Sequence, residues 1–209
     1  MSAGNSKRDL ICEAAIRTAG RDGLLAMTLD NVAKEAGISK GGVMYHFPTK
    51  DDLVRGMLEY FGTQGEQMLM QRIADDPNPG MRWARAFISC MFPTPDDPAH
   101  NSPTFSPELI EKMMLTTVAA AVNAPEMLDP LRELGKRLKS RLMQDPKDGL
   151  EQLLVWLAVD GLLLWQFIGL IDRSDPLFAK VGEALRERIR MRTSQEVSTQ
   201  PEEAPPVSA

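Results

Sequence analysis

The stretch from Thr28 to Lys50, TLDNVAKEAGISKGGVMYHFPTK, is the most informative part of this chain. It predicts a short helix that ends at Gly37, because glycine adopts the left-handed conformation of a tight turn without steric cost. Ser39 is suited to cap a second helix, Pro48 ends it, and Thr49 is suited to cap a third. Two short helices across a glycine turn are typical of a helix-turn-helix, which presents its second helix to the major groove of DNA.

The charge of this stretch also fits a DNA contact. From Ala36 to Lys50 there is no Asp or Glu, whereas Lys, His, Ser, Thr and Tyr all occur. Such basic and hydroxyl side chains bond phosphate oxygens and fix the register of a protein on DNA. Spacing alone leaves a second interpretation open, an ordinary helix pair within an all-helical core.

Residues 8–58 resemble the N-terminal domain of the tetracycline-repressor (TetR/AcrR) family. The resemblance is continuous and rests on five segments: Ile11 to Ala15, Asp22-Gly23, Thr28-Leu29, Val32 to Gly41, and Tyr45 to Leu53. It implies an all-α fold, with a three-helix DNA-binding domain at residues 1–55. A larger helical domain at residues 56–193 would then bind an effector and form a homodimer.

The resemblance also implies roles for individual residues. Phosphate contacts are expected from Thr28, Ser39, Tyr45, His46 and Lys50. Base contacts are expected from Lys40, which can donate to guanine, and from Met44, which can contact a thymine methyl group. Gly41 and Gly42 would allow close approach of the backbone. Gly42 departs from the family, which often has a larger residue there, so fewer side chains reach the bases.

Composition bounds the remaining possibilities. The chain has 209 residues, 43% of them hydrophobic, and a net charge of −5. Residues 1–61 hold eight Lys or Arg and eight Asp or Glu, whereas residues 62–209 hold sixteen and twenty-one. The acidic excess therefore lies in the C-terminal part, and DNA contact needs only a local field.

Two cysteines and two histidines, widely spaced, suggest neither a disulfide nor a metal site, and no cofactor is expected. No phosphate loop or catalytic set is recognisable, so we expect no enzyme. No signal-peptide pattern opens the sequence, which favours a cytoplasmic protein.

The C-terminal part shows repeated helical patterns and no convincing strand. Helices are expected at residues 51–75, 80–91, 107–123, 125–144, 146–171 and 176–192. The proline-rich residues 93–107 predict a loop that could cover a cavity. Residues 194–209 have three prolines and no basic residue, and predict a disordered tail.

Residues 153–171 carry one charge, Asp160, and are apolar enough to span a membrane. We expect instead a helix buried on all sides, with no membrane partner. The resemblance implies that the last two helices form a four-helix dimer interface. Candidate interface residues are Ala158, Gly161, Trp165, Gly169, Leu177, Val181 and Leu185. The alternative is core packing within one subunit.

Thirteen methionines are a high number for this length. Methionine adapts to varied apolar shapes, so the methionines of the middle helices predict either plain core or an effector cavity. Candidate lining residues are Phe61, Met68, Phe87, Met91, Phe105, Met113, Met114, Trp156, Asp160 and Trp165. As the one acid in its apolar run, Asp160 should have a partner.

These features favour a homodimeric repressor that binds a palindromic operator on double-stranded DNA. Its two reading helices would lie roughly 34–36 Å apart, and a small apolar or amphipathic effector would release it. The alternatives are an activator whose ligand promotes DNA binding, or a helical binding protein whose helix-turn-helix has lost its DNA role. The doubled glycine at Gly41 and Gly42 favours the last of these.

Overall fold

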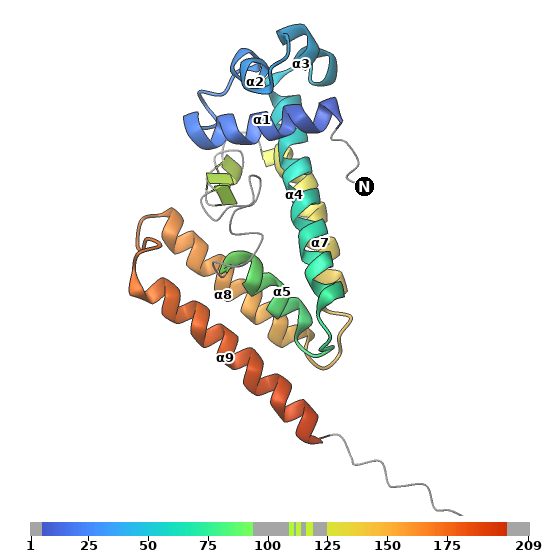
Figure 1. Ribbon diagram of the computed structural model, residues 1–209, viewed down its shortest axis with the longest axis vertical. Helices are drawn as coiled ribbons and strands as arrows, with labels where there is room; N and C mark the ends of the chain where they lie inside the picture. The colour runs from blue at the N-terminus through green and yellow to red at the C-terminus, as the bar shows by residue number, and fades with distance from the viewer. Residues whose placement is uncertain (1–5, 94–108, 111, 114–115, 119–124, 200–209) are drawn as a thin grey trace, which may run out of the picture.

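The computed structural model describes residues 6–93, 109–110, 112–113, 116–118 and 125–199, with the side chains of residues 195–199 left aside. All regular structure in these residues is helical, which confirms the predicted fold class (Figure 1). The elements are α1 (Lys7–Asp22), α2 (Leu29–Ala36), α3 (Lys40–His46), α4 (Lys50–Asp75), α5 (Arg82–Met91), a 3₁₀ turn η2 (Pro125–Leu128), α7 (Asp129–Leu142), α8 (Gly149–Phe167) and α9 (Pro176–Thr199).

Local signals set the boundaries of the first helices. The Ser39 hydroxyl accepts a hydrogen bond from the backbone N–H of Gly42 at 3.1 Å and so caps α3. Thr49 and Asp52 form a reciprocal capping box at the start of α4. Gly37 ends α2 with a φ of 68°, a left-handed conformation that favours glycine. These three boundaries confirm the sequence prediction.

A single core holds the first four helices together. Phe47, directly after α3, packs over Gly56 in α4, and a Cβ atom at Gly56 would lie 2.4 Å from the Phe47 ring. The Cys12 thiol of α1 lies 3.5 Å from the Gly56 carbonyl oxygen, to which it donates. Gly56 is therefore required by packing, and it fixes α3 against α4.

Helix α4 extends from the helix-turn-helix into the C-terminal domain, with α7 alongside it (Figure 1). Leu131 and Leu134 of α7 close on Gly62 of α4, where a Cβ atom would lie 3.0 Å from each leucine. Glu66 of α4 pairs with Arg137 and Arg141 of α7, at 3.1 and 3.3 Å. Any shift of α7 therefore acts directly on α4.

A buried glutamine joins α5 to α8. Met81 precedes α5 in a left-handed conformation and gives no side-chain cap. Instead, the Gln152 side-chain oxygen accepts from the backbone N–H groups of Trp83 and Ala84, at 2.9 and 3.3 Å, and its amide donates to Asp145 at 3.2 Å. The free donors at the start of α5 are thus satisfied by a residue of another helix.

Helix α8 has one buried and one exposed apolar face, so the expectation of a helix buried on all sides is wrong. Val155, Val159 and Leu162 lie in the core with α5 and α9. On the opposite face Leu150 is 63% exposed and Leu157 is 57% exposed. The length and composition of α8 would also suit a membrane span, and a third of that window is buried in the chain.

Other boundaries differ from the sequence prediction. Helix α8 begins at Gly149 and ends at Phe167, inside the expected range of 146–171. Helix α9 continues to Thr199, so the expected tail at residues 194–209 begins inside a helix. The expected loop at 93–107 lies almost entirely outside the described residues, and the described parts of 107–123 are helical.

Candidate nucleic-acid interface and effector region

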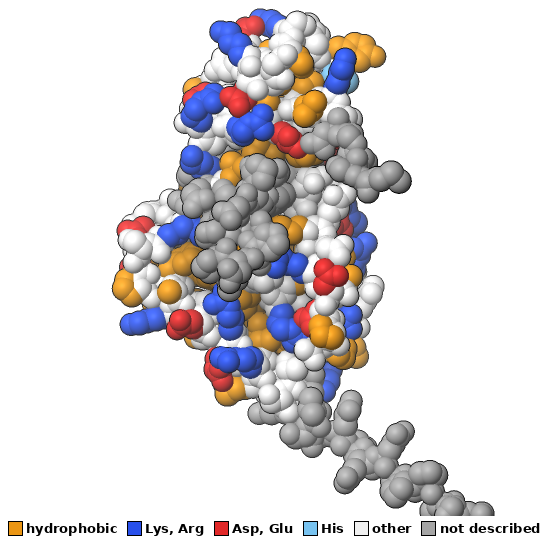
Figure 2. All heavy atoms as spheres, viewed as in Figure 1, with side chains coloured by type: hydrophobic (Ala, Val, Ile, Leu, Met, Phe, Trp, Pro, Cys, Tyr) orange, Lys and Arg blue, Asp and Glu red, His pale blue; other side chains and the backbone are white. Residues whose placement is uncertain are grey.

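Helix α3 lies with α2 at one end of the molecule, far from α8 and α9 (Figure 1). Tyr45 is 85% exposed, and Met44 and Lys40 are also exposed. Figure 2 shows Lys and Arg side chains around this end, interspersed with acidic ones. The predicted reading helix therefore presents its side chains to solvent, as a major-groove contact requires.

Lys40 has a partner that the sequence did not suggest. Its Nζ lies 2.9 Å from Asp30 Oδ2 of α2, and the two side chains are 53% and 54% exposed. An exposed pair of this kind contributes only about 0–1 kcal/mol, so the lysine remains available to a base or a phosphate. Asp30 lies in the first turn of α2 and Lys40 is the first residue of α3. The distance between the two side chains therefore depends on the turn that joins the two helices.

Other predicted phosphate contacts already hold local hydrogen bonds. The Thr28 hydroxyl donates to Asn31 Oδ1 at 2.5 Å and accepts from the Asn31 backbone N–H at 3.2 Å. Lys50 Nζ donates to the Leu25 carbonyl at 2.9 Å. The rings of Tyr45 and His46 meet edge to face, with centroids 5.1 Å apart. These contacts hold the side chains in place beside α3.

Neither glycine of α3 is required by the fold. A Cβ atom at Gly41 would meet only Ser39 Oγ, at 4.0 Å. At Gly42 the nearest atom would be Ser39 Oγ at 3.4 Å, an ordinary contact. Gly37, in contrast, has a positive φ. The bare backbone at Gly41 therefore faces open space, where it allows a close approach from outside.

The predicted effector residues divide between two clusters. Met68, Phe87, Met91 and Trp156 pack together around Leu69, Ala86, Cys90 and Leu138. Phe61 and Met113 instead pack with the N-terminal core, so the residues predicted to line the effector cavity do not form one cluster. Phe105 and Met114 lie outside the described residues.

Asp160 and two aromatic side chains form a group at the edge of the first cluster. The rings of Phe87 and Trp156 have centroids 5.1 Å apart. Asp160 follows Trp156 by one helical turn and accepts a hydrogen bond from its side chain. The residue as a whole is exposed, but nearby protein atoms shield its carboxyl group from water. This desolvation raises the pKa of Asp160 to about 6. The predicted partner of Asp160 is therefore an indole N–H.

The predicted interface residues also take different positions. Ala158, Trp165 and Leu177 are exposed, and a Cβ atom at Gly161 would meet nothing within 4 Å. Trp165, assigned to both the interface and the effector cavity, lies on the exposed face of α8, with 49% of its surface accessible.

Three more of the residues predicted for the interface have a structural role within one subunit. Val181 and Leu185 pack against the core that α5, α8 and α9 share, because that side of α9 faces inward. Gly169 has a φ of 74° and ends α8, since the backbone N–H of Leu170 returns to the Trp165 carbonyl at 2.9 Å. Their positions have an explanation within one subunit, which was the alternative to an interface role.

An apolar row on α8 was missed from the sequence. It comprises Leu150, Leu154, Leu157, Leu164 and Ile168, all exposed. With Gly161 included, the spacing alternates between four and three residues, as in the seam of a coiled coil. The signal was present in the sequence, but the opposite face is equally apolar and concealed it. We call these six residues the α8 seam.

An N-terminal helix-turn-helix, joined by a long helix to a helical domain, defines a class of DNA-binding transcription regulators. Residues 11–57 match the model of the bacterial regulatory proteins of the tetR family. Residues 81–190, more than half of the chain, match the tetracyclin repressor-like C-terminal domain. The chain therefore belongs to the TetR family of transcriptional regulators, which are not enzymes. Within the described residues, no cluster of three or more potential metal ligands occurs.

Individual relatives agree with this assignment. The HTH-type transcriptional regulator BetI of Rhizobium meliloti is 25% identical over 191 residues, which cover 87% of this chain and 86% of BetI. The uncharacterized HTH-type transcriptional regulator YerO of Bacillus subtilis is 37% identical over 57 residues, 27% of this chain and 20% of YerO. A transcriptional regulator from Saccharomonospora viridis in complex with choline shares the fold, with a TM-score of 0.66 and 18% identity over 88% of this chain and 95% of that one.

Proposed function

We propose that this protein is a homodimeric repressor that a small amphipathic effector releases from DNA. The observation that carries the proposal is the continuity of α4. Its first turns hold α3 through the contact of Phe47 with Gly56, and its later turns hold α7 through the contact with Gly62. A helix of 26 residues is about 39 Å long at about 1.5 Å per residue. A tilt caused in the C-terminal domain would thus displace the reading helix.

The α8 seam supports the homodimer. Isolated surface leucines are common, but a continuous apolar row on a long helix marks an interaction site. The open backbone at Gly161 would let the same helix of a second copy approach closely. Leu177 and Met191 of α9 are exposed as well and would extend the interface. Two copies would present two α3 helices to successive major grooves of a palindrome.

The aromatic and acidic group supports an effector with a cationic head. Aromatic faces attract quaternary ammonium groups, and Asp160 would supply a negative charge beside Phe87 and Trp156. The neighbouring methionines, Met68 and Met91, would adapt to an apolar body. The Saccharomonospora viridis relative holds choline, which is such a cation.

A DNA-binding titration tests this function. Fluorescence anisotropy would follow a labelled duplex from the region upstream of the gene, with and without decyltrimethylammonium. We expect tight binding to a palindrome in that region and release by the cation. The Asp160→Asn variant should bind DNA normally but need at least about tenfold more of the cation for release, because it loses a charge-assisted contact.

Gly41→Ala is the matched test of the DNA contact itself. The fold has room for the methyl group, and alanine favours a helix over glycine by up to about 1 kcal/mol. We therefore expect unchanged or higher thermal stability together with weaker DNA binding. Normal DNA binding by Gly41→Ala would contradict the proposed approach of DNA to α3. An unaltered affinity at saturating cation would contradict the proposed coupling.

A further inference from the structure

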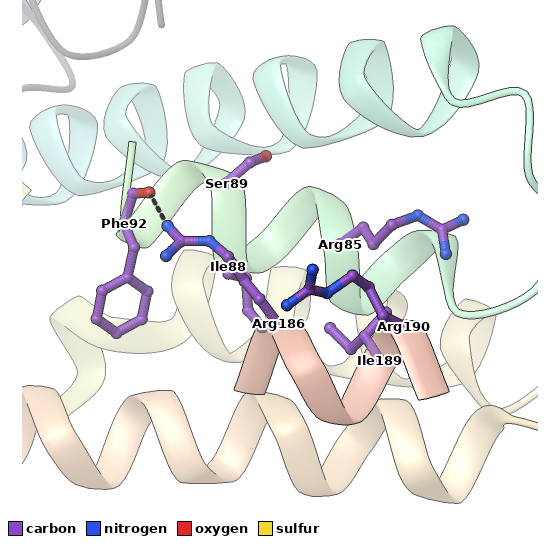
Figure 3. Close-up of a pocket in the computed structure, with 7 residues that line it drawn as sticks. All are labelled: Arg85, Ile88, Ser89, Phe92, Arg186, Ile189 and Arg190. Atoms are coloured by element: carbon purple, nitrogen blue, oxygen red, sulfur yellow. Dashed lines mark hydrogen bonds between the residues drawn. The ribbon is translucent and has the colours of Figure 1, made fainter. Parts of the chain in front are cut away.

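A cavity with a volume of about 540 Å³ lies between α5 and α9 (Figure 3). This volume is within the range of small-molecule sites, about 300–1,000 Å³. The cavity shares no residue with the group of Phe87, Trp156 and Asp160. By helical spacing it also lies on the side of α9 opposite the exposed Leu177 and Met191. It is therefore separate from both the proposed effector group and the proposed dimer interface.

The floor of the cavity is apolar and its rim is basic. Ile88 and Phe92, within and just after α5, and Ile189 of α9 form the floor, and each is buried. The rim carries three arginines, Arg85, Arg186 and Arg190, and Figure 3 shows the guanidinium of Arg186 directed toward Phe92. A basic rim above an apolar floor is complementary to an amphipathic anion.

Arg186 carries the least compensated charge of the three. Its guanidinium donates to the Phe92 backbone carbonyl at 2.6 Å and lies 5.9 Å from the centroid of the Phe92 ring. Both of these partners are neutral, and across the described ranges no carboxylate lies within ion-pair distance of Arg186. The remaining N–H donors of the Arg186 guanidinium suit a carboxylate or a phosphate.

The other two arginines differ in how firmly they are held. Arg190 pairs with Glu187 at a site where the two side chains are 73% and 51% exposed, so the pair is weak and the guanidinium can turn to a bound anion. Arg85 bonds Asp76 at 2.6 Å and the Asn78 carbonyl at 2.7 Å. Arg85 is therefore a fixed part of the wall, whereas Arg190 is available to a ligand.

We propose that this cavity binds an amphipathic anion. A carboxylate or phosphate head would bond Arg186 and Arg190, and the apolar body would lie on Ile88 and Phe92. This inference does not rest on the proposed function, because the site uses neither the reading helix nor the α8 seam.

Isothermal titration calorimetry on the full chain without DNA tests the proposal. Decanoate and decyl phosphate are the anionic probes, and whichever binds more tightly identifies the preferred head. Decanol and decyltrimethylammonium carry the same apolar body without a negative charge, and decyltrimethylammonium should depend on Asp160 instead. Arg186→Gln and Arg190→Gln should each weaken anion binding by about tenfold or more, since each loses a charge-assisted hydrogen bond.

Lys180→Gln is the matched control, because Lys180 is an exposed cation on the same helix and outside the cavity. It should leave anion binding unchanged. Arg186→Lys keeps the charge and should retain part of the affinity, and thermal unfolding would check that each variant is folded. Failure of both anions to bind the natural chain would overturn the proposal. So would equally tight binding of decanol, or unchanged anion affinity in a folded Arg186→Gln variant.

Discussion

The N-terminal and C-terminal parts of this molecule differ in how completely one chain covers its own apolar surface. The first four helices close around a single core in which Ile11, Val43 and Leu53 are fully buried. The C-terminal helices form two further cores but leave the whole α8 seam outside. The part formed by α1, α2, α3 and the first turns of α4, which we call the reading domain, is thus complete within one chain, whereas the C-terminal domain presents a face that a second copy would cover.

The largest expected effect comes from charging the α8 seam. Leu157→Glu should dissociate the dimer and weaken operator binding by more than about a hundredfold, because a buried charge removes an interface anchor and a lone half-site binds poorly. Leu25→Glu is the control for association alone, since Leu25 is 83% exposed but lies in the reading domain, beside Lys50. Sedimentation velocity should give a monomer for the first variant and a dimer for the second. A dimeric Leu157→Glu would exclude the seam as the interface.

Two helical glycines test how much the contact of Phe47 with Gly56 contributes to the stability of the reading domain. Gly56→Ala should lower the free energy of unfolding by about 1–3 kcal/mol, because its methyl group would collide with the Phe47 ring. Gly135→Ala on α7 meets nothing within 4 Å and should raise stability by up to about 1 kcal/mol. Denaturant unfolding measures both. Equal changes for the two variants would mean that the contact of Phe47 with Gly56 has little weight.

The C-terminal domain depends on a buried polar link between α5 and α8. Gln152→Leu should lower the free energy of unfolding by about 1–3 kcal/mol, since two backbone N–H groups at the start of α5 would lose their acceptor. Gln144→Leu makes the same change at an exposed position and should stay within about 0.5 kcal/mol of the natural chain. A loss of similar size in both variants would show that the effect is unrelated to capping.

The smallest effect concerns the pH dependence of stability. Desolvation raises the pKa of the Asp160 carboxyl from an ordinary 3.8 to about 6 in the folded chain. The folded state therefore binds this proton more tightly than the unfolded state does. The contribution of Asp160 to the free energy of unfolding should therefore rise as pH falls from about 6 to about 4. Asp160→Asn should be slightly more stable at pH 7 and should lose this dependence. Urea titrations at several pH values would measure it, and a variant less stable at pH 7 would contradict the assignment.

Sequence alone predicts the reading domain well because its signals are local. Gly37, Ser39 and Thr49 each act within a few residues, so caps and turns follow directly from the chain. The family models confirm the domain that these residues indicated. Even so, pairs such as Lys40 with Asp30 depend on how the helices meet in space.

The C-terminal domain is less predictable because its decisive contacts join distant residues. Gln152 caps a helix that begins about seventy residues earlier, and Arg186 meets Phe92 across 94 residues. Hydropathy identified α8 as apolar but could not say that only one face is buried within the chain. The apolar periodicity of α9 likewise gave no sign that Val181 and Leu185 face inward.

Chemical cross-linking across the α8 seam is the sharpest test of the proposed dimer. Gly161→Cys and Gly135→Cys both place a thiol where the chain itself leaves open space. The native thiols of Cys12 and Cys90 are buried, and burial raises the pKa of Cys12 to about 12, so neither should react. With a short bis-maleimide, we expect a covalent dimer for Gly161→Cys and a monomer for Gly135→Cys. A monomer for both variants, or equal cross-linking of both, would contradict the proposed dimer.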